Sequence, residues 1–171
     1  MTRLPSGRTD AVEFEFGRNS AATALNGVLA NVPNLWRQVS GIAQWYRHDS
    51  TLPPRLRELA ILAIAGEFGA DYAIAQHIPL AAATGLSQIT IAAALKRPTA
   101  VGGDASAIEQ VGVDVALSMV RHDSLSDVLW KQAEKEWSVE QIVELCVLAS
   151  FYRMICTLCK ACEMPPEPNV T

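Results

Sequence analysis

Along most of the chain, apolar residues recur every three or four positions rather than in strict alternation, which is the pattern of helices that bury one face. Prolines and glycines separate the segments that carry this pattern. We therefore predict an all-α protein built as a single-domain helical bundle. The predicted helices cover about residues 20–29, 33–47, 53–67, 71–84, 87–95, 106–121, 127–137 and 139–162.

Several predicted helix ends carry recognisable signals. Pro53 and Pro54 suit a first helical turn, where the missing N–H has no partner in any case. Gly85 suits a left-handed C-terminal cap, and residues 138–141 form a capping box in which a serine and a glutamine satisfy each other's backbone N–H groups. These signals place helix boundaries independently of the apolar pattern.

A short sequence echo links the two halves of the chain. Residues 58–63, in one predicted helix, and residues 144–149, in the last one, share Glu, Leu, Leu and Ala at equivalent positions. Two amphipathic helices of similar composition would explain this echo. The other interpretation, which we carry forward, is an internal duplicated helical unit.

Composition fits one compact domain. The chain has 171 residues, of which 50% are hydrophobic, so it can bury a sizeable core without metal or disulfide. We expect the helical domain to span residues 19–168, with a flexible N-terminal segment at 1–18 and a tail at 169–171. The loop at 96–105 is too short to separate two independent domains.

Charge and hydropathy narrow the expected partners and location. The net charge is −4 and the basic residues are scattered, so we expect no nucleic-acid partner. The first twenty residues contain no apolar run typical of a secretory signal, and the longest uncharged stretch, residues 72–95, is too polar for a membrane helix. We therefore expect a cytoplasmic protein without a membrane partner.

Three of the four cysteines crowd into residues 156–162, at helical spacing among apolar neighbours. Such cysteines are commonly buried as small hydrophobic side chains, and we predict packing as their main role. Three thiols on one continuous helix cannot surround a tetrahedral ion, so we predict no metal site. Cys156 and Cys159 remain redox candidates, although disfavoured.

His77 is the leading candidate for chemistry. It lies on an apolar helix face, where a histidine is either a hydrogen-bonded core residue or a catalyst. Glu58 lies among the apolar residues of the preceding helix, which must pack antiparallel because only a short loop joins the two. A carboxylate there needs a donor if it is buried, and His77 or Tyr72 can supply one.

At these residues the sequence resembles the carboxymuconolactone decarboxylase and alkylhydroperoxidase-like superfamily. The resemblance rests on LPPRLRELAIL (52–62), Tyr72, HIPLA (77–81) and GLS (85–87), and it extends over about residues 30–168. It implies an all-helical fold with a duplicated unit, assembled into trimers or hexamers. In the hydroperoxidase branch, Glu is followed after eleven residues by Cys-x-x-Cys and, three residues later, by His.

Neither half of this chain carries that complete set. Glu58 and His77 stand in the first half, but alanines 70 and 73 occupy the cysteine positions. In the second half Glu144 is followed by Cys156 and Cys159, but Glu163 stands where histidine is expected. The resemblance is therefore to the decarboxylase-like branch, and it excludes thiol chemistry beside His77.

The expected function is that of a lyase-type enzyme without cofactor, which decarboxylates a small carbonyl or lactone compound or carries out related proton transfer. His77 would be the acid/base, Glu58 would orient it, and Tyr72 would donate a hydrogen bond to an enolate oxygen. Arginines suit a carboxylate substrate and aromatic rings suit a flat one, so the predicted substrate-binding residues are Arg55, Arg57, Arg153 and Trp45. Three alternatives stay open: an isomerase or dehydratase using the same residues, a thiol redox protein, and a non-catalytic oligomeric scaffold.

Overall fold

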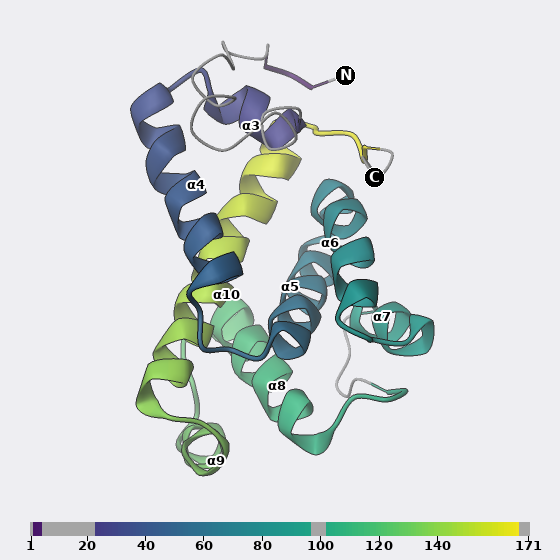
Figure 1. Ribbon diagram of the computed structural model, residues 1–171, viewed down its shortest axis with the longest axis vertical. Coiled ribbons are helices and arrows are strands. Elements are labelled where there is room, and N and C mark those ends of the chain that lie inside the picture. The colour runs from purple at the N-terminus through teal and green to yellow at the C-terminus, as the bar shows by residue number, and fades with distance from the viewer. Residues whose placement is uncertain (1, 5–22, 97–101, 168–171) are drawn as a thin grey trace.

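The computed structural model describes residues 2–4, 23–96 and 102–167, and within these ranges it contains helices and no strand (Figure 1). The all-α prediction is confirmed. The predicted N-terminal segment 1–18, apart from residues 2–4, lies outside the described residues, as do the tail 169–171 and the first residues of the helix predicted to begin at 20. The helices are α3 (Ala24–Leu29), α4 (Pro33–His48), α5 (Pro54–Phe68), α6 (Asp71–Ala83), α7 (Gln88–Ala94), α8 (Ala107–His122), α9 (Asp127–Glu136) and α10 (Val139–Ala161).

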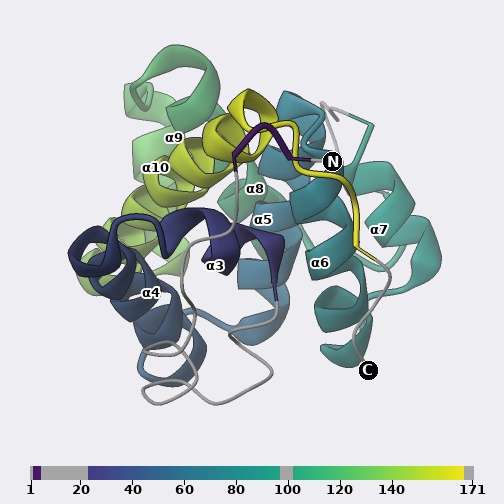
Figure 2. The ribbon, with the colours of Figure 1, turned by 90° about the horizontal axis from the view of Figure 1, so that it is seen from above.

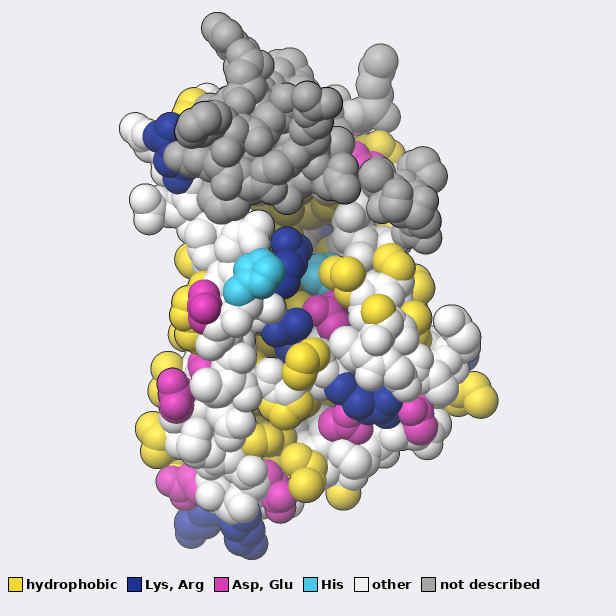
Figure 3. Space-filling model, in the orientation of Figure 1, with side chains coloured by type: hydrophobic (Ala, Val, Ile, Leu, Met, Phe, Trp, Pro, Cys, Tyr) yellow, Lys and Arg dark blue, Asp and Glu magenta, His cyan; other side chains and the backbone are white. Residues whose placement is uncertain are grey.

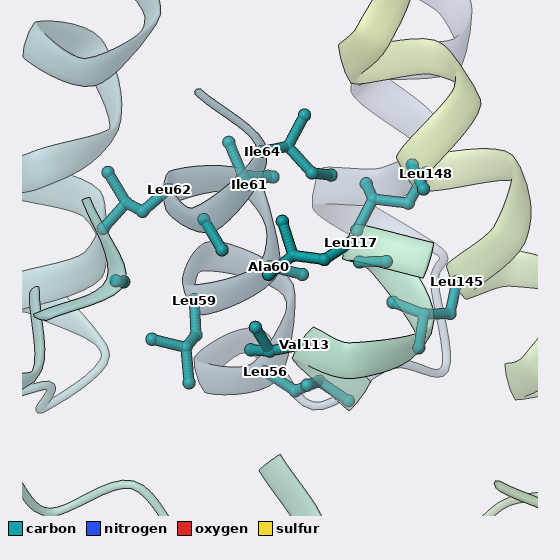
Figure 4. Packing of buried hydrophobic residues seen from close by; sticks show 14 of the residues in the cluster. Leu56, Leu59, Ala60, Ile61, Leu62, Ile64, Val113, Leu117, Leu145 and Leu148 are labelled. Carbon is teal, nitrogen blue, oxygen red and sulfur yellow. The ribbon is translucent and has the colours of Figure 1, made fainter. Parts of the chain in front are cut away.

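Helix α5 is the centre of the molecule. Every residue from Glu58 to Gly66 is buried, and the helix packs against α6, α7, α8 and α10. In Figure 4, Leu56 of α5 lies beside Val113 of α8, Leu145 and Leu148 of α10 lie on the same side, and Leu59 and Leu62 of α5 point the other way. Because α5 is apolar on all sides, a buried carboxylate on it has to be paired inside the protein.

Gly69 breaks the chain between α5 and α6. Its backbone is left-handed, with φ 57° and ψ 48°, and it ends α5 with hydrogen bonds from the N–H groups of residues 69 and 70 to the last turn. The chain then turns back, so α6 packs antiparallel along α5 (Figure 1). The break brings together residues that lie far apart along the chain.

Helix α10, which carries the sequence echo, has no such break. It runs for 23 residues from its capping box at Ser138 and Gln141. It is long and apolar enough to cross a membrane by length and composition, but half of its most apolar window is buried inside this protein, where α10 packs on α5 and α8. Burial of that kind is equally typical of a core helix.

A smaller apolar cluster closes one end of the bundle. It joins α3 and α4 to Tyr72 of α6, to Phe151 and Ile155 of α10, and to Met164 after α10. Glu167 then accepts hydrogen bonds from the backbone N–H of Ala24 at 2.7 Å and from the side chain of Gln76 at 3.2 Å. The segment after α10 therefore ties α3 to α6, as the view from above shows (Figure 2).

Candidate functional site

The α5–α6 hairpin places His77 directly against Glu58. Nδ1 of His77 lies 2.7 Å from Oε2 of Glu58, and the two side chains are 13% and 7% exposed. An ionised carboxylate can only accept a hydrogen bond, so Nδ1 carries the proton of this pair. Nε2 makes no hydrogen bond to a described residue, and it is left as the nitrogen that can accept or donate a proton.

Arg57 holds the second oxygen of the same carboxylate. Its Nε lies 3.6 Å from Oε1 of Glu58, and its Nη1 donates a hydrogen bond to the backbone oxygen of Tyr46. The carboxylate therefore lies between a guanidinium and an imidazole. This arrangement keeps the negative charge compensated inside the protein and fixes the orientation of the imidazole.

His77 lies on the wall of a pocket of about 550 Å³, a volume that suits a small-molecule ligand. The walls come from α3, α4, α6 and α10, and they carry ten apolar and nine polar residues. Figure 3 shows histidine and basic side chains gathered beside an acidic one in a hollow of this face. The polar lining residues are Thr23, Asn26, Ser40, Gln44, Arg47, Tyr72, Gln76, His77 and Tyr152.

Tyr72 lines the pocket too, but its hydroxyl is already engaged. It accepts a hydrogen bond from the backbone N–H of Leu25 at 3.2 Å and thereby satisfies one free N–H in the first turn of α3. Burial raises the pKa of Tyr72 to about 12, so the group stays a neutral phenol. Tyr72 therefore fixes α3 over the pocket, and the Thr23 side chain also interacts with its hydroxyl.

Tyr152 is a pocket residue that the sequence reasoning missed. Its ring packs edge to face on His77, with ring centroids 5.1 Å apart and an interplanar angle of 81°. Burial raises the pKa of Tyr152 well above its ordinary value, and the negative charge of Glu58 adds to this, while Arg47 and Arg57 oppose it. The side chain is therefore a neutral hydrogen-bond donor beside the imidazole.

Arg47 is a second pocket residue that the sequence analysis did not predict, although its spacing along α4 indicates its position. Trp36, Ser40, Ala43 and Arg47 follow one another at spacings of four, three and four residues, so they share one face of α4. All four line the pocket. Knowing that this face of α4 covers His77 would have singled out Arg47.

The other predicted substrate-binding residues lie elsewhere. Arg55 binds Asp104, Glu109 and the backbone oxygen of Gly85. Arg153 pairs with Asp123 on the surface. Closeness along the sequence favours these arginines, but the fold pairs them with other residues, and they are not among the lining residues of the pocket. Arg57 lies behind Glu58 rather than in the pocket wall.

Trp45 lies on a different side of α4 from the His77 pocket. It lines a separate groove of about 380 Å³ between α4 and α10, together with Ile42, Val143 and Val147. One face of α4 therefore covers the His77 pocket. Another face, which carries Trp45, borders the groove beside α10.

Cys156 and Cys159 are buried free thiols on α10. Burial raises the pKa of each to about 12, so neither forms a thiolate readily. Cys156 comes twelve residues after Glu144 on an unbroken helix, which separates the two by about 18 Å. The second half of the chain therefore does not repeat the Glu58–His77 geometry.

The carboxylate of Glu144 serves instead to hold the loop before α5. It accepts hydrogen bonds from the hydroxyls of Ser50 and Thr51, at 2.6 and 2.9 Å, and from the N–H groups of Thr51 and Leu52. Among the residues that the structure describes, no group of three or more His, Cys, Asp or Glu side chains could hold a metal ion.

Comparisons with known proteins identify the fold. The sequence model of the carboxymuconolactone decarboxylase family matches residues 30–114, which include the α5–α6 hairpin. No curated protein sequence matches the chain. A structure titled alkylhydroperoxidase AhpD core, an uncharacterized peroxidase-related protein from Ralstonia eutropha JMP134, superposes with a TM-score of 0.81 at 14% identity, covering 97% of this chain and 92% of its own.

A second solved structure, an uncharacterized peroxidase-related protein from Silicibacter sp. TM1040, superposes with a TM-score of 0.77 at 13% identity, covering 93% of this chain and 82% of its own. At such identities the likeness concerns the fold alone. The sequence match covers the residues that form the buried Glu58–His77 pair. Residues 30–114 therefore belong to the carboxymuconolactone decarboxylase family, and the fold of the chain is that of the two solved structures.

Proposed function

We propose that this protein is an enzyme that moves protons on a small carbonyl or lactone compound without a cofactor, with decarboxylation as the leading reaction. The observation that carries the proposal is the Glu58–His77 pair, held at 2.7 Å on the wall of the pocket. A carboxylate-oriented imidazole supplies general acid–base catalysis near neutral pH from the protein itself.

For an unsaturated lactone acid, the reaction breaks the bond between carbon and the departing carboxylate. Its electron pair passes into the conjugated lactone as a dienolate, and carbon dioxide leaves. His77 in its protonated form then delivers the proton of Nε2 to carbon and recovers a proton from solvent. Glu58 stabilises the imidazolium and fixes its orientation, and Arg57 holds Glu58 in place.

The dienolate carries negative charge on oxygen, so the enzyme has to donate hydrogen bonds to it. Tyr72 is the predicted donor, since its hydroxyl stays protonated. The same residues suit an isomerase or dehydratase, in which His77 removes a proton next to a carbonyl and returns one elsewhere.

The test is a panel of lactone acids and enolisable carbonyl compounds incubated in deuterated water and followed by proton NMR. Deuterium incorporation with loss of carbon dioxide supports decarboxylation, incorporation with a shifted double bond supports an isomerase, and loss of water supports a dehydratase. We expect His77→Gln to abolish either signal while the melting temperature and helical signal stay close to wild type.

The matched control is His122→Gln, which removes an exposed histidine at the end of α8 and should leave turnover unchanged. A wild-type rate in His77→Gln would end the acid/base proposal. Loss of stability in parallel with activity would instead assign His77 a packing role.

A further inference from the structure

Arg47 differs from the other arginines in the described parts of the chain. Arg3, Arg37, Arg55, Arg57, Arg121 and Arg153 each hydrogen-bond or pair with another residue. Arg47 makes no such interaction with a residue that the structure describes, although it lies on the wall of the His77 pocket. Within that wall, as far as the structure describes it, Arg47 is the one permanently charged side chain, and no acidic residue lines the pocket.

Tyr152 is also without a hydrogen-bonding partner among the described residues. No described polar side-chain atom is both fully buried and unpaired, so the Tyr152 hydroxyl reaches accessible space. The residue lines the same pocket and packs against His77. The wall that holds His77 therefore also holds a guanidinium and a phenol, both hydrogen-bond donors with no acceptor supplied by the described part of the protein.

We propose that Arg47 and Tyr152 form an anion subsite of this pocket and that its ligands are small carboxylates with a flat apolar body. A guanidinium binds a carboxylate with charge-assisted hydrogen bonds, and a phenol donates a further one. The apolar walls, which include Trp36, Val39 and Phe151, fit the rest of such a ligand. The role of this subsite in catalysis rests on the proposed function, whereas carboxylate binding can be tested without it.

The subsite also constrains the substrate. A carboxylate held by a guanidinium is stabilised before reaction, which opposes its loss as carbon dioxide. The group bound by Arg47 should therefore be one that remains in the product. The substrate would then carry a second acidic group or an activated carbon elsewhere, close to His77, and the product would bind to the same subsite.

Calorimetric titration with benzoate and with its neutral isostere benzamide tests the subsite without turnover. We expect wild type to bind benzoate about tenfold or more tightly than benzamide, because charge-assisted hydrogen bonds are lost in the amide. Arg47→Gln should bring the two affinities together, and Arg47→Lys should keep part of the preference. Tyr152→Phe should weaken benzoate binding severalfold at an unchanged melting temperature.

The matched control is Arg37→Gln, which removes the same charge from the same helix outside the pocket wall. Equal weakening by Arg37→Gln and Arg47→Gln, equal affinity of wild type for the two ligands, or no benzoate binding at millimolar concentration would each overturn the subsite. His77→Gln should retain the preference for benzoate. A charge-dependent affinity without turnover of any lactone acid would leave the subsite standing and refute the proposed reaction.

Discussion

Glu144 and Glu58 occupy equivalent places in the sequence echo, and each is 5% exposed. Their partners differ. Glu58 faces a histidine and an arginine at a pocket, whereas Glu144 accepts hydrogen bonds from hydroxyl and N–H groups of the loop at 50–52. The first set of partners suits proton transfer, and the second suits holding the start of α5.

We therefore expect opposite consequences from matched substitutions. Glu144→Ala should lower the free energy of unfolding by about 2–4 kcal/mol, because it leaves several partly buried donors without their acceptor. Glu58→Gln should cost activity far more than stability. Denaturant unfolding and turnover, measured on both variants, check the pair, and a stable Glu144→Ala protein would contradict the assigned role.

Glu144 also predicts how stability depends on pH. Burial alone would raise its pKa, but the hydrogen bonds from Ser50, Thr51 and Leu52 outweigh burial and lower the pKa below its ordinary value of 4.5. Because the folded pKa is the lower one, the stabilisation is complete above the unfolded pKa and is lost as the pH falls through the folded value. The free energy of unfolding of wild type should therefore fall over about 2 pH units below pH 5. Glu144→Gln should lose less stability over the same range.

The thiols of α10 give another prediction, on their reactivity in the folded protein. With pKa values raised to about 12 by burial, Cys156 and Cys159 should react with a thiol reagent at neutral pH only after unfolding. Replacing both by alanine should leave the main activity in place. Fast labelling of the folded protein, or loss of a peroxide-reducing activity in the double variant, would favour the redox alternative.

At the residue level, sequence reasoning identified Glu58 and His77 because a short loop between two helices forces them to pack against each other. Arg47 and Tyr152 were missed because their part in the pocket depends on how α4 and α10 lie relative to α6. Arg55 and Arg153 were named for their closeness along the chain. That measure fails on a helix, where a neighbour in sequence points in another direction.

At the scale of the helices, α7 packs closely on α5 because Gly66 lets the backbone of Leu95 come near. A side-chain carbon there would lie 2.7–2.9 Å from the backbone of Leu95, at the end of α7. We expect Gly66→Ala to lower the free energy of unfolding by about 1–3 kcal/mol because the two helices must move apart. The corresponding fall in melting temperature is about 2–4 °C per kcal/mol for a chain of this size.

Gly41→Ala is the control for that substitution. An added carbon on this α4 residue would meet nothing within 4 Å, so the higher helix propensity of alanine should raise stability by about 0.5–1 kcal/mol. Opposite signs for the two variants would support the close approach at Gly66. A neutral Gly66→Ala variant would refute it.

Most element boundaries could be predicted from caps and breakers, because these act locally. Ser87, Ser106, Ser126 and Ser138 all accept a hydrogen bond from the first turn of the helix that they precede. Caps and breakers do not predict how the two halves of the chain pack against each other. The sequence echo does not reveal that one half bends at Gly69 whereas the other continues straight through α10.

At the scale of the whole molecule, an apolar surface runs along α4 and α10. Leu35, Ile42 and Trp45 on α4 and Val139, Val143 and Val147 on α10 are all between 39% and 71% exposed. The two helix faces adjoin across the groove that contains Trp45. Exposed apolar patches of this kind commonly mark contacts between subunits.

We expect this surface to hold the protein in trimers or hexamers, as the family resemblance implies. Val143→Glu should dissociate the assembly, because it places a charge in the middle of the groove. Val128→Glu, on α9 and 70% exposed, is the matched control and should change nothing. Light scattering would settle the point: a wild-type mass of 18.5 kDa at micromolar concentration contradicts the assembly.

The unbroken course of α10 has a consequence for assigning functions across genomes. A motif search for Glu, eleven residues and Cys-x-x-Cys would select Glu144, Cys156 and Cys159 and report a thiol peroxidase centre. In three dimensions these residues are spread along one straight helix, and the carboxylate is occupied by the loop before α5. A reliable search would also require the left-handed glycine between the glutamate and the histidine, since that turn brings the two side chains together.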